Sequence, residues 1–191
     1  MGVNQSTSDL SIVHSVLAGN HTAYEELVVR HKSYAYSIAL RILNNEMDAE
    51  EVAHDAFIKA FRSLKNFNQQ AKFTTWLYRI VFNAAISRKR KEGKINADLE
   101  EADKVISDHP HPQAQFEQEE RALFIQEAIT KLQPIDASVL TLFYMKQLNL
   151  EEIGQITGIK ANAVKVKLHR ARKRLAIELD NVLSNEAIQL L

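Results

Sequence analysis

The stretch Asn149–Leu175 constrains the fold more than any other part of the chain, because it predicts two short helices joined by a tight turn. Asn149 and Glu152 form a capping-box pattern at the start of the first helix. Gly158 follows the last helical positions, where a residue in the left-handed conformation costs least. A second helix is predicted from about Ala161. The pattern is typical of a helix-turn-helix.

The second helix of this pair has chemically different sides. Its buried sector is predicted to contain Val164, Leu168, Ala171 and Leu175. The opposite face carries Val166, His169, Arg170 and Lys173, and the two flanks carry Lys165 with Arg172 and Lys167 with Arg174. A helix that enters the DNA major groove needs such an apolar seam, an exposed face for the bases and basic edges for the phosphates. The alternative is a surface helix with a solvated charged face. Six basic residues in ten, with no acid among them, favour DNA binding.

Composition favours an all-α fold, because glycine and proline number only 5 and 3 in 191 residues and β-branched runs are few. The absence of cysteine excludes disulfides and Cys-ligated metals. No apolar run approaches the length of a membrane span, and the N-terminus lacks the basic and apolar regions of a signal peptide. We therefore expect a soluble cytoplasmic protein without direct membrane contact.

The net charge of zero hides an uneven distribution. Residues 1–92 carry a net charge of +3, residues 93–120 carry −6, and residues 121–191 carry +3. We expect two helical domains, 1–92 and 121–191, joined by a flexible acidic linker, 93–120. His109 and His111 in the linker have no evident third ligand, so neither a metal site nor any other cofactor is expected.

Four helices are predicted in the first domain: Asp9–Leu17, about Thr22–Leu43, about Asp48–Leu64 and about Trp76–Lys91. Capping boxes are expected at Thr22 with Glu25 and at Asp48 with Glu51, and Thr74 or Thr75 is expected to cap the fourth helix. His31 lies on an apolar stripe and is predicted to be an interior residue. The acids near the start of the third helix either complement its macrodipole or form a protein-docking surface.

One face of the fourth helix combines aromatic, amide, hydroxyl and basic groups, namely Trp76, Ile80, Asn83, Ser87 and Arg90. Such a face can hold single-stranded nucleic acid through stacking and backbone charge. The alternative is that Trp76 and Phe82 belong to the core and that the basic run complements the helix C-terminus.

Three stretches in series resemble a known family. They are AYEELVVRHKSYAYSIALRILNNEMDAEEVAHDAFIKAFRSLKNF (Ala23–Phe67), FTTWLYRIVFNAAISRKRK (Phe73–Lys91) and LQPIDASVLTLFYMKQLNLEEIGQITGIKANAVKVKLHRARKRL (Leu132–Leu175). Together they resemble the bacterial RNA polymerase sigma factors of the sigma-70 family, in its small extracytoplasmic-function (ECF) subfamily. The resemblance implies sigma region 2 in Ala23–Lys91 and sigma region 4 in Leu123–Leu183.

The resemblance also implies three binding sites. The polymerase clamp coiled coil is expected to bind Asp48, Glu50, Glu51, His54 and Asp55. Region 2 is expected to melt the minus-ten promoter element and to hold a flipped base at Asn83. The residues expected to contact this element are Asn66, Phe67, Lys72, Phe73, Thr74, Asn83, Ser87 and Arg90. The minus-35 element is expected to contact Lys165, Val166, Lys167, His169, Arg170, Arg172 and Lys173, with Val166 placed to lie against a thymine methyl group.

We therefore expect a sigma factor that binds core RNA polymerase, directs it to specific promoters and opens the minus-ten region. An anti-sigma factor is a further partner that the resemblance implies. The alternative is a helix-turn-helix regulator that binds duplex DNA without becoming a polymerase subunit. An enzyme is disfavoured, because no glycine-rich phosphate loop, metal cluster or nucleophile constellation is present.

Overall fold

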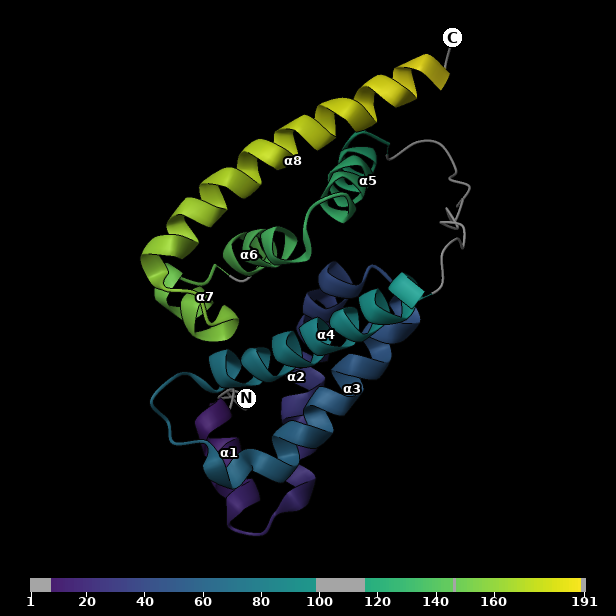
Figure 1. Cartoon of the computed structure of the whole chain (residues 1–191). Coiled ribbons are helices and arrows are strands. Elements are labelled where there is room, and N and C mark those ends of the chain that lie inside the picture. The colour runs from purple at the N-terminus through teal and green to yellow at the C-terminus, as the bar shows by residue number, and fades with distance from the viewer. Residues whose placement is uncertain (1–7, 99–115, 146, 190–191) are drawn as a thin grey trace.

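The computed structural model describes residues 8–98, 116–145 and 147–189, and within these ranges every regular element is a helix. The N-terminal lobe contains α1 (Asp9–Leu17), the short η1 (His21–Ala23), α2 (Tyr24–Leu43), α3 (Glu46–Ser63), η2 (Leu64–Asn66) and α4 (Phe73–Asp98). The C-terminal lobe contains α5 (Phe116–Thr130), α6 (Pro134–Tyr144), α7 (Leu150–Thr157) and α8 (Ala161–Gln189) (Figure 1). The predicted all-α fold is confirmed. None of the described helices combines the length and the apolar character that a membrane span requires.

Helices α2, α3 and α4 pack against one another around the core of the N-terminal lobe. Leu27, Ile38 and Leu77 are among its fully buried side chains. His31 is buried, as predicted, and its Nε2 lies 2.9 Å from a carboxylate oxygen of Asp9, which ties α1 to α2. The interior of this lobe is therefore mainly apolar, and Asp9 joins the first helix to both His31 and Arg30 of α2.

The predicted caps of α2 and α3 are wrong. The chain forms a 3-10 turn before α2, so Thr22 donates its hydroxyl to Asn20 (2.7 Å) and no side chain caps the helix. At α3 the amide oxygen of Asn45 accepts a hydrogen bond from the backbone N–H of Asp48 (3.0 Å). Asn45 competes successfully because its extended backbone places its side chain before the first turn.

Helix α4 begins earlier and ends later than the sequence predicted. It starts at Phe73, so neither Thr74 nor Thr75 is its cap. It continues to Asp98, helped by ion pairs of Glu92 with two basic residues one turn before it. Helix α5 starts at Phe116, so both helices reach into the range predicted as linker. His109 and His111 lie outside the described residues.

Helix α8 is the longest element of the C-terminal lobe, and α5, α6 and α7 all pack against it. It continues to Gln189, and Val182 is fully buried. Several large apolar residues are exposed, among them Leu10, Leu17, Leu123 and Met145. Their hydrophobicity satisfied the helical period, but no neighbouring element covers them.

The two lobes are in contact, since α7 packs against α4 and α6 packs against α2 (Figure 1). All side chains from residue 137 to residue 142 of α6 are buried, which requires neighbours on every side of that helix. At the edge of the contact, Lys72 Nζ lies 2.8 Å from a carboxylate oxygen of Glu152. Lys72 also lowers the pKa of Glu152 through this hydrogen bond.

Candidate nucleic-acid interface

The helix-turn-helix forms as predicted. Asn149 Oδ1 accepts from the Glu152 N–H at 2.9 Å, and the Glu152 carboxylate accepts from the Asn149 N–H at 3.0 Å, so the capping box is complete. Gly158 ends α7 in the left-handed conformation, with φ of 75°. These local hydrogen bonds define where α7 begins and ends, and they set the start of α8.

The close approach of α7 to the following turn depends on Gly154, which the sequence analysis did not single out. A Cβ atom at this position would lie 2.7 Å from the carbonyl oxygen of Ile159. Glycine in the interior of a helix costs about 0.5–1 kcal/mol relative to alanine. That cost is a signal that could have marked Gly154, because an interior glycine usually has a packing reason.

The predicted seam of α8 is confirmed, since Val164, Leu168 and Ala171 are buried and Leu175 is partly buried. On the opposite side, Val166 is half exposed, and His169, Arg170 and Lys173 are exposed. Lys165 is exposed on one flank. The structure therefore presents this reading face, defined as Val166, His169, Arg170 and Lys173, to solvent.

Three basic residues on the flanks of α8 are engaged within the lobe. The guanidinium carbon of Arg172 lies 5.3 Å from the ring centroids of both Phe143 and Tyr144, which is a cation–π geometry. Lys167 Nζ lies 3.1 Å from Oδ1 of Asp136, and Arg174 donates to Oδ2 of the same carboxylate. No local sequence pattern predicts this pairing, because Asp136 belongs to α6 and lies far from α8 along the chain.

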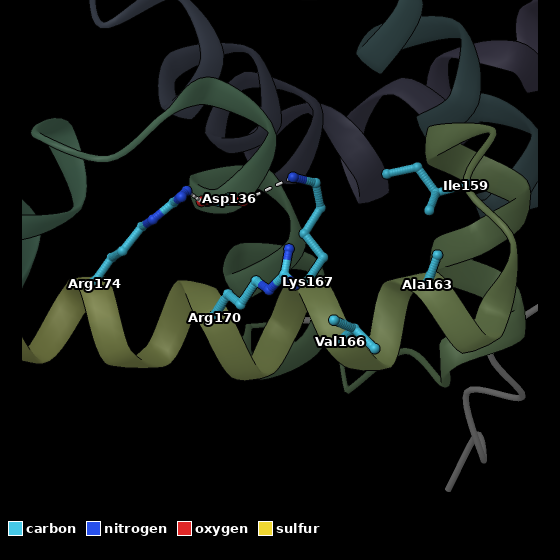
Figure 2. A pocket seen from close by; sticks show the side chains of 7 residues that line it. All are labelled: Asp136, Ile159, Ala163, Val166, Lys167, Arg170 and Arg174. Atoms are coloured by element: carbon cyan, nitrogen blue, oxygen red, sulfur yellow. Dashed lines mark hydrogen bonds and ion pairs between the residues drawn. The ribbon is translucent and has the colours of Figure 1, made fainter.

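Asp136, Lys167 and Arg174 border a groove of about 340 Å³ on α8. Its lining is completed by Ile159 from the turn and by Ala163, Val166 and Arg170 from α8 (Figure 2). Figure 2 shows Lys167 and Arg174 reaching Asp136 from two different turns of the helix. The groove thus combines a basic wall with one buried carboxylate.

The minus-ten candidates fall into an exposed and a buried group. Asn66, Lys72, Asn83, Ser87 and Arg90 are exposed, and the last three lie on one side of α4. Phe67 and Phe73 are buried, and Thr74 is partly buried. The two phenylalanines pack on the half-buried Trp76, with ring centroids 5.3 Å and 5.9 Å from it. Trp76 therefore belongs to the edge of the core, and the polar residues form the accessible row.

The polymerase-binding candidates lie on α3, where Glu50, His54 and Asp55 are exposed. Asp48 and Glu51 both accept hydrogen bonds from Arg88 of α4. The hydrogen bond that Arg88 donates to Asp48, together with the charges of Asp48 and Glu51, raises the pKa of Arg88. Met47, which the sequence analysis did not note, is 80% exposed beside them. This acidic surface of α3 is thus part apolar and partly neutralised.

Metal binding has no support in the described ranges, where no three His, Asp or Glu side chains gather in a suitable group. The aromatic, amide and basic groups on α4 and α8 suit contacts with bases and phosphates instead.

Comparison with known proteins agrees with this geometry. Residues 27–95 match the family Sigma-70 region 2, and residues 125–175 match the family Sigma-70, region 4. The ECF RNA polymerase sigma factor SigW of Bacillus subtilis (strain 168) is 32% identical over 176 residues, which cover 87% of this chain and 94% of that protein. The ECF RNA polymerase sigma-E factor of Escherichia coli (strain K12) is 28% identical over 182 residues, or 91% of this chain and 95% of that protein.

A solved structure shows the same fold. It is the co-crystal structure of the sigma factor RpoE in complex with the anti-sigma factor NepR from Bartonella quintana, with a TM-score of 0.69 and 20% identity over 82% of this chain and 96% of that one. With both region models matched and a relative above 30% identity aligned over nearly its whole length, the chain belongs to the ECF subfamily of the sigma-70 RNA polymerase sigma factors.

Proposed function

We propose that this sigma factor binds core RNA polymerase through α3, reads the minus-35 element as duplex with α8, and holds unstacked minus-ten bases on α4. It acts by binding alone and has no catalytic residues. The observation that carries the proposal is that one chain presents two separate exposed polar surfaces, the reading face of α8 and the polar row of α4. A cytoplasmic location follows from the role, since the polymerase works there.

On α8, the reading face supplies the contacts that select sequence. Arg170 is exposed, and arginine reads guanine through paired hydrogen bonds in the major groove. Val166 presents an apolar surface suited to a thymine methyl group. His169 and Lys173 complete the face, and Lys165 is placed for a phosphate.

On α4, Asn83 supplies the amide for an unpaired base, and Arg90 supplies charge for the strand. Unstacking a base costs a few kcal/mol, which a specific pocket offsets. The buried Phe67 and Phe73 support the preceding loop from beneath. Ser87 donates its hydroxyl to the backbone carbonyl oxygen of Asn83 at 2.7 Å, so its hydroxyl oxygen can only accept a hydrogen bond from a base.

The charge distribution explains why such a chain needs its polymerase. Residues 1–92 and residues 121–191 each carry a net charge of only +3. This charge gives only weak sequence-independent attraction to DNA. We propose that the acidic face of α3, with Glu50 and Asp55 exposed, provides the polymerase contact. By analogy with the sigma factor of the solved complex, an anti-sigma factor is a further proposed partner.

Abortive transcription tests the proposal. Core polymerase with this protein should make short transcripts from a promoter library, whereas core polymerase alone should not. A chain that binds promoter fragments, yields no transcripts and does not co-purify with core polymerase would instead be a helix-turn-helix regulator. The Asp55→Lys variant is the matched control, because it should lose transcripts while its DNA-binding helix is intact.

A further inference from the structure

Asp136 holds the most deeply buried carboxylate among the described ion pairs, with its side chain only 1% exposed. It lies in the first turn of α6, next to Pro134, and both of its oxygens point to α8. A carboxylate in such a place is stable only when cations and hydrogen bonds compensate for its lost hydration. Lys167 and Arg174 provide that compensation.

The two cations come from one side of α8 (Figure 2). They are seven residues apart, which is two helical turns or roughly 10 Å along the axis. A single carboxylate between them therefore ties α8 to α6 at two points. Since residues 137–142 of α6 are all buried, Asp136 fixes the recognition helix to a well-packed support.

The contacts of Asp136 with Lys167 and Arg174 also reduce the positive charge that α8 presents to DNA. The run Lys165–Arg174 contains six basic residues. Two of them share the charge of Asp136, and Arg172 lies over two aromatic rings. The basic residues left for DNA are those of the reading face and Lys165, which form no ion pair within the described part of the chain.

We propose that Asp136 is a positioning residue of the recognition helix that withholds Lys167 and Arg174 from DNA phosphates. Phosphate attraction is the same for every sequence, so withholding it lowers nonspecific binding while the reading face keeps its contacts. Asp136 thereby raises the preference for promoter over random DNA. The resemblance implies that Lys167 contacts the minus-35 element, but this proposal makes Asp136 its partner instead of DNA. The proposal rests on the proposed DNA-binding role of α8.

Salt dependence measures the withheld charge directly. Each cation that neutralises a phosphate steepens the plot of log binding constant against log salt by about 0.9. In the full-length chain on a labelled random-sequence duplex, Lys165→Met should reduce the slope by about this amount. Arg174→Met should leave the slope unchanged, because Asp136 holds its guanidinium away from the phosphates. An equal reduction in both variants would overturn the proposal.

Asp136→Asn gives the converse test. It should release both cations, steepen the slope by up to about 1.8 and tighten binding to random DNA. A triple variant that adds Lys167→Met and Arg174→Met should restore the wild-type slope. Loss of affinity without a steeper slope, in a variant with wild-type helicity by circular dichroism, would contradict the proposal. If Asp136→Asn does not fold, the Lys165 and Arg174 pair decides the question. If neither variant of that pair and no Arg170→Met variant alters binding, α8 is not the DNA surface and the proposed function itself fails.

Discussion

Replacing Gly154 with alanine should damage DNA binding more than it damages stability. The new Cβ would lie 2.7 Å from the Ile159 carbonyl oxygen, and contacts shorter than 3.0 Å are essentially never made by real Cβ atoms. The turn must therefore move away from α7 by at least about 0.3 Å. Because the contact is with backbone, no side-chain rotation can relieve it. The displaced turn leads directly into α8, so the reading face shifts with it.

The magnitude follows from two opposing effects. Removing glycine from a helix interior stabilises by about 0.5–1 kcal/mol, whereas overpacking costs about 1–3 kcal/mol. The net loss is about 1 kcal/mol, or roughly 2–4 °C in the thermal midpoint for a chain of this size. The assays are thermal unfolding by circular dichroism and duplex binding by fluorescence anisotropy at low salt, well below the midpoint.

Gly158→Ala is the matched control. Its φ of 75° strains any L side chain, by about 1–2 kcal/mol, but no atom lies within 4 Å of the added Cβ. The two variants should therefore lose similar stability, and only Gly154→Ala should lose DNA affinity. A Gly154→Ala protein with an unchanged or higher midpoint and unchanged affinity would refute the steric argument.

Four further predictions concern other surfaces. Arg170→Ala should cost about 1–3 kcal/mol on cognate promoters in competition assays, and an equal loss on random DNA would reassign it to a phosphate. Asn83→Ala should retain polymerase binding but impair opening, so permanganate footprints identical to wild type would disprove its role. Asp55→Lys should weaken co-purification with core polymerase, and an unaltered pull-down would exclude that docking site. Because Lys72 lowers the pKa of Glu152, their pair stabilises the folded chain above the unfolded pKa of about 4.3 and is lost as pH falls through the folded value. The thermal midpoint of Glu152→Gln should thus lie below wild type at pH 7 and converge with it in acid; a constant difference would argue against the pair.

Features set by neighbouring residues were predictable from the sequence. The capping box of α7 joins Asn149 to Glu152, three residues apart, and the seam of α8 follows the helical period. Other local predictions were wrong because two neighbouring residues could play the same part. Asn45 caps α3 in place of Asp48, since both side chains can accept a hydrogen bond from a backbone N–H of the first turn. A helical period also cannot reveal which apolar residues find a neighbour, as the exposed Leu123 shows.

Long-range pairing was beyond the reach of sequence patterns. Asp136 lies 31 residues from Lys167 and 38 from Arg174, and its position in α6 gives no local sign of a partner. From the sequence, Lys167 and Arg174 had no evident acidic partner, because Asp136 lies on another helix. The burial of Phe67 and Phe73 could not be predicted from the sequence either, because it depends on how both rings pack against Trp76.

The contact between α7 and α4 sets a limit on what the closed chain can reach. Positions minus-ten and minus-35 are about 25 base pairs apart, or roughly 85 Å of duplex at 3.4 Å per pair. Helix α8, with 29 residues, is only about 44 Å long. Lobes that touch therefore cannot occupy both elements, and promoter engagement requires them to separate. The free energy of this interface, including the exposed pair of Lys72 with Glu152, is then a threshold that polymerase binding must exceed before the chain can span a promoter.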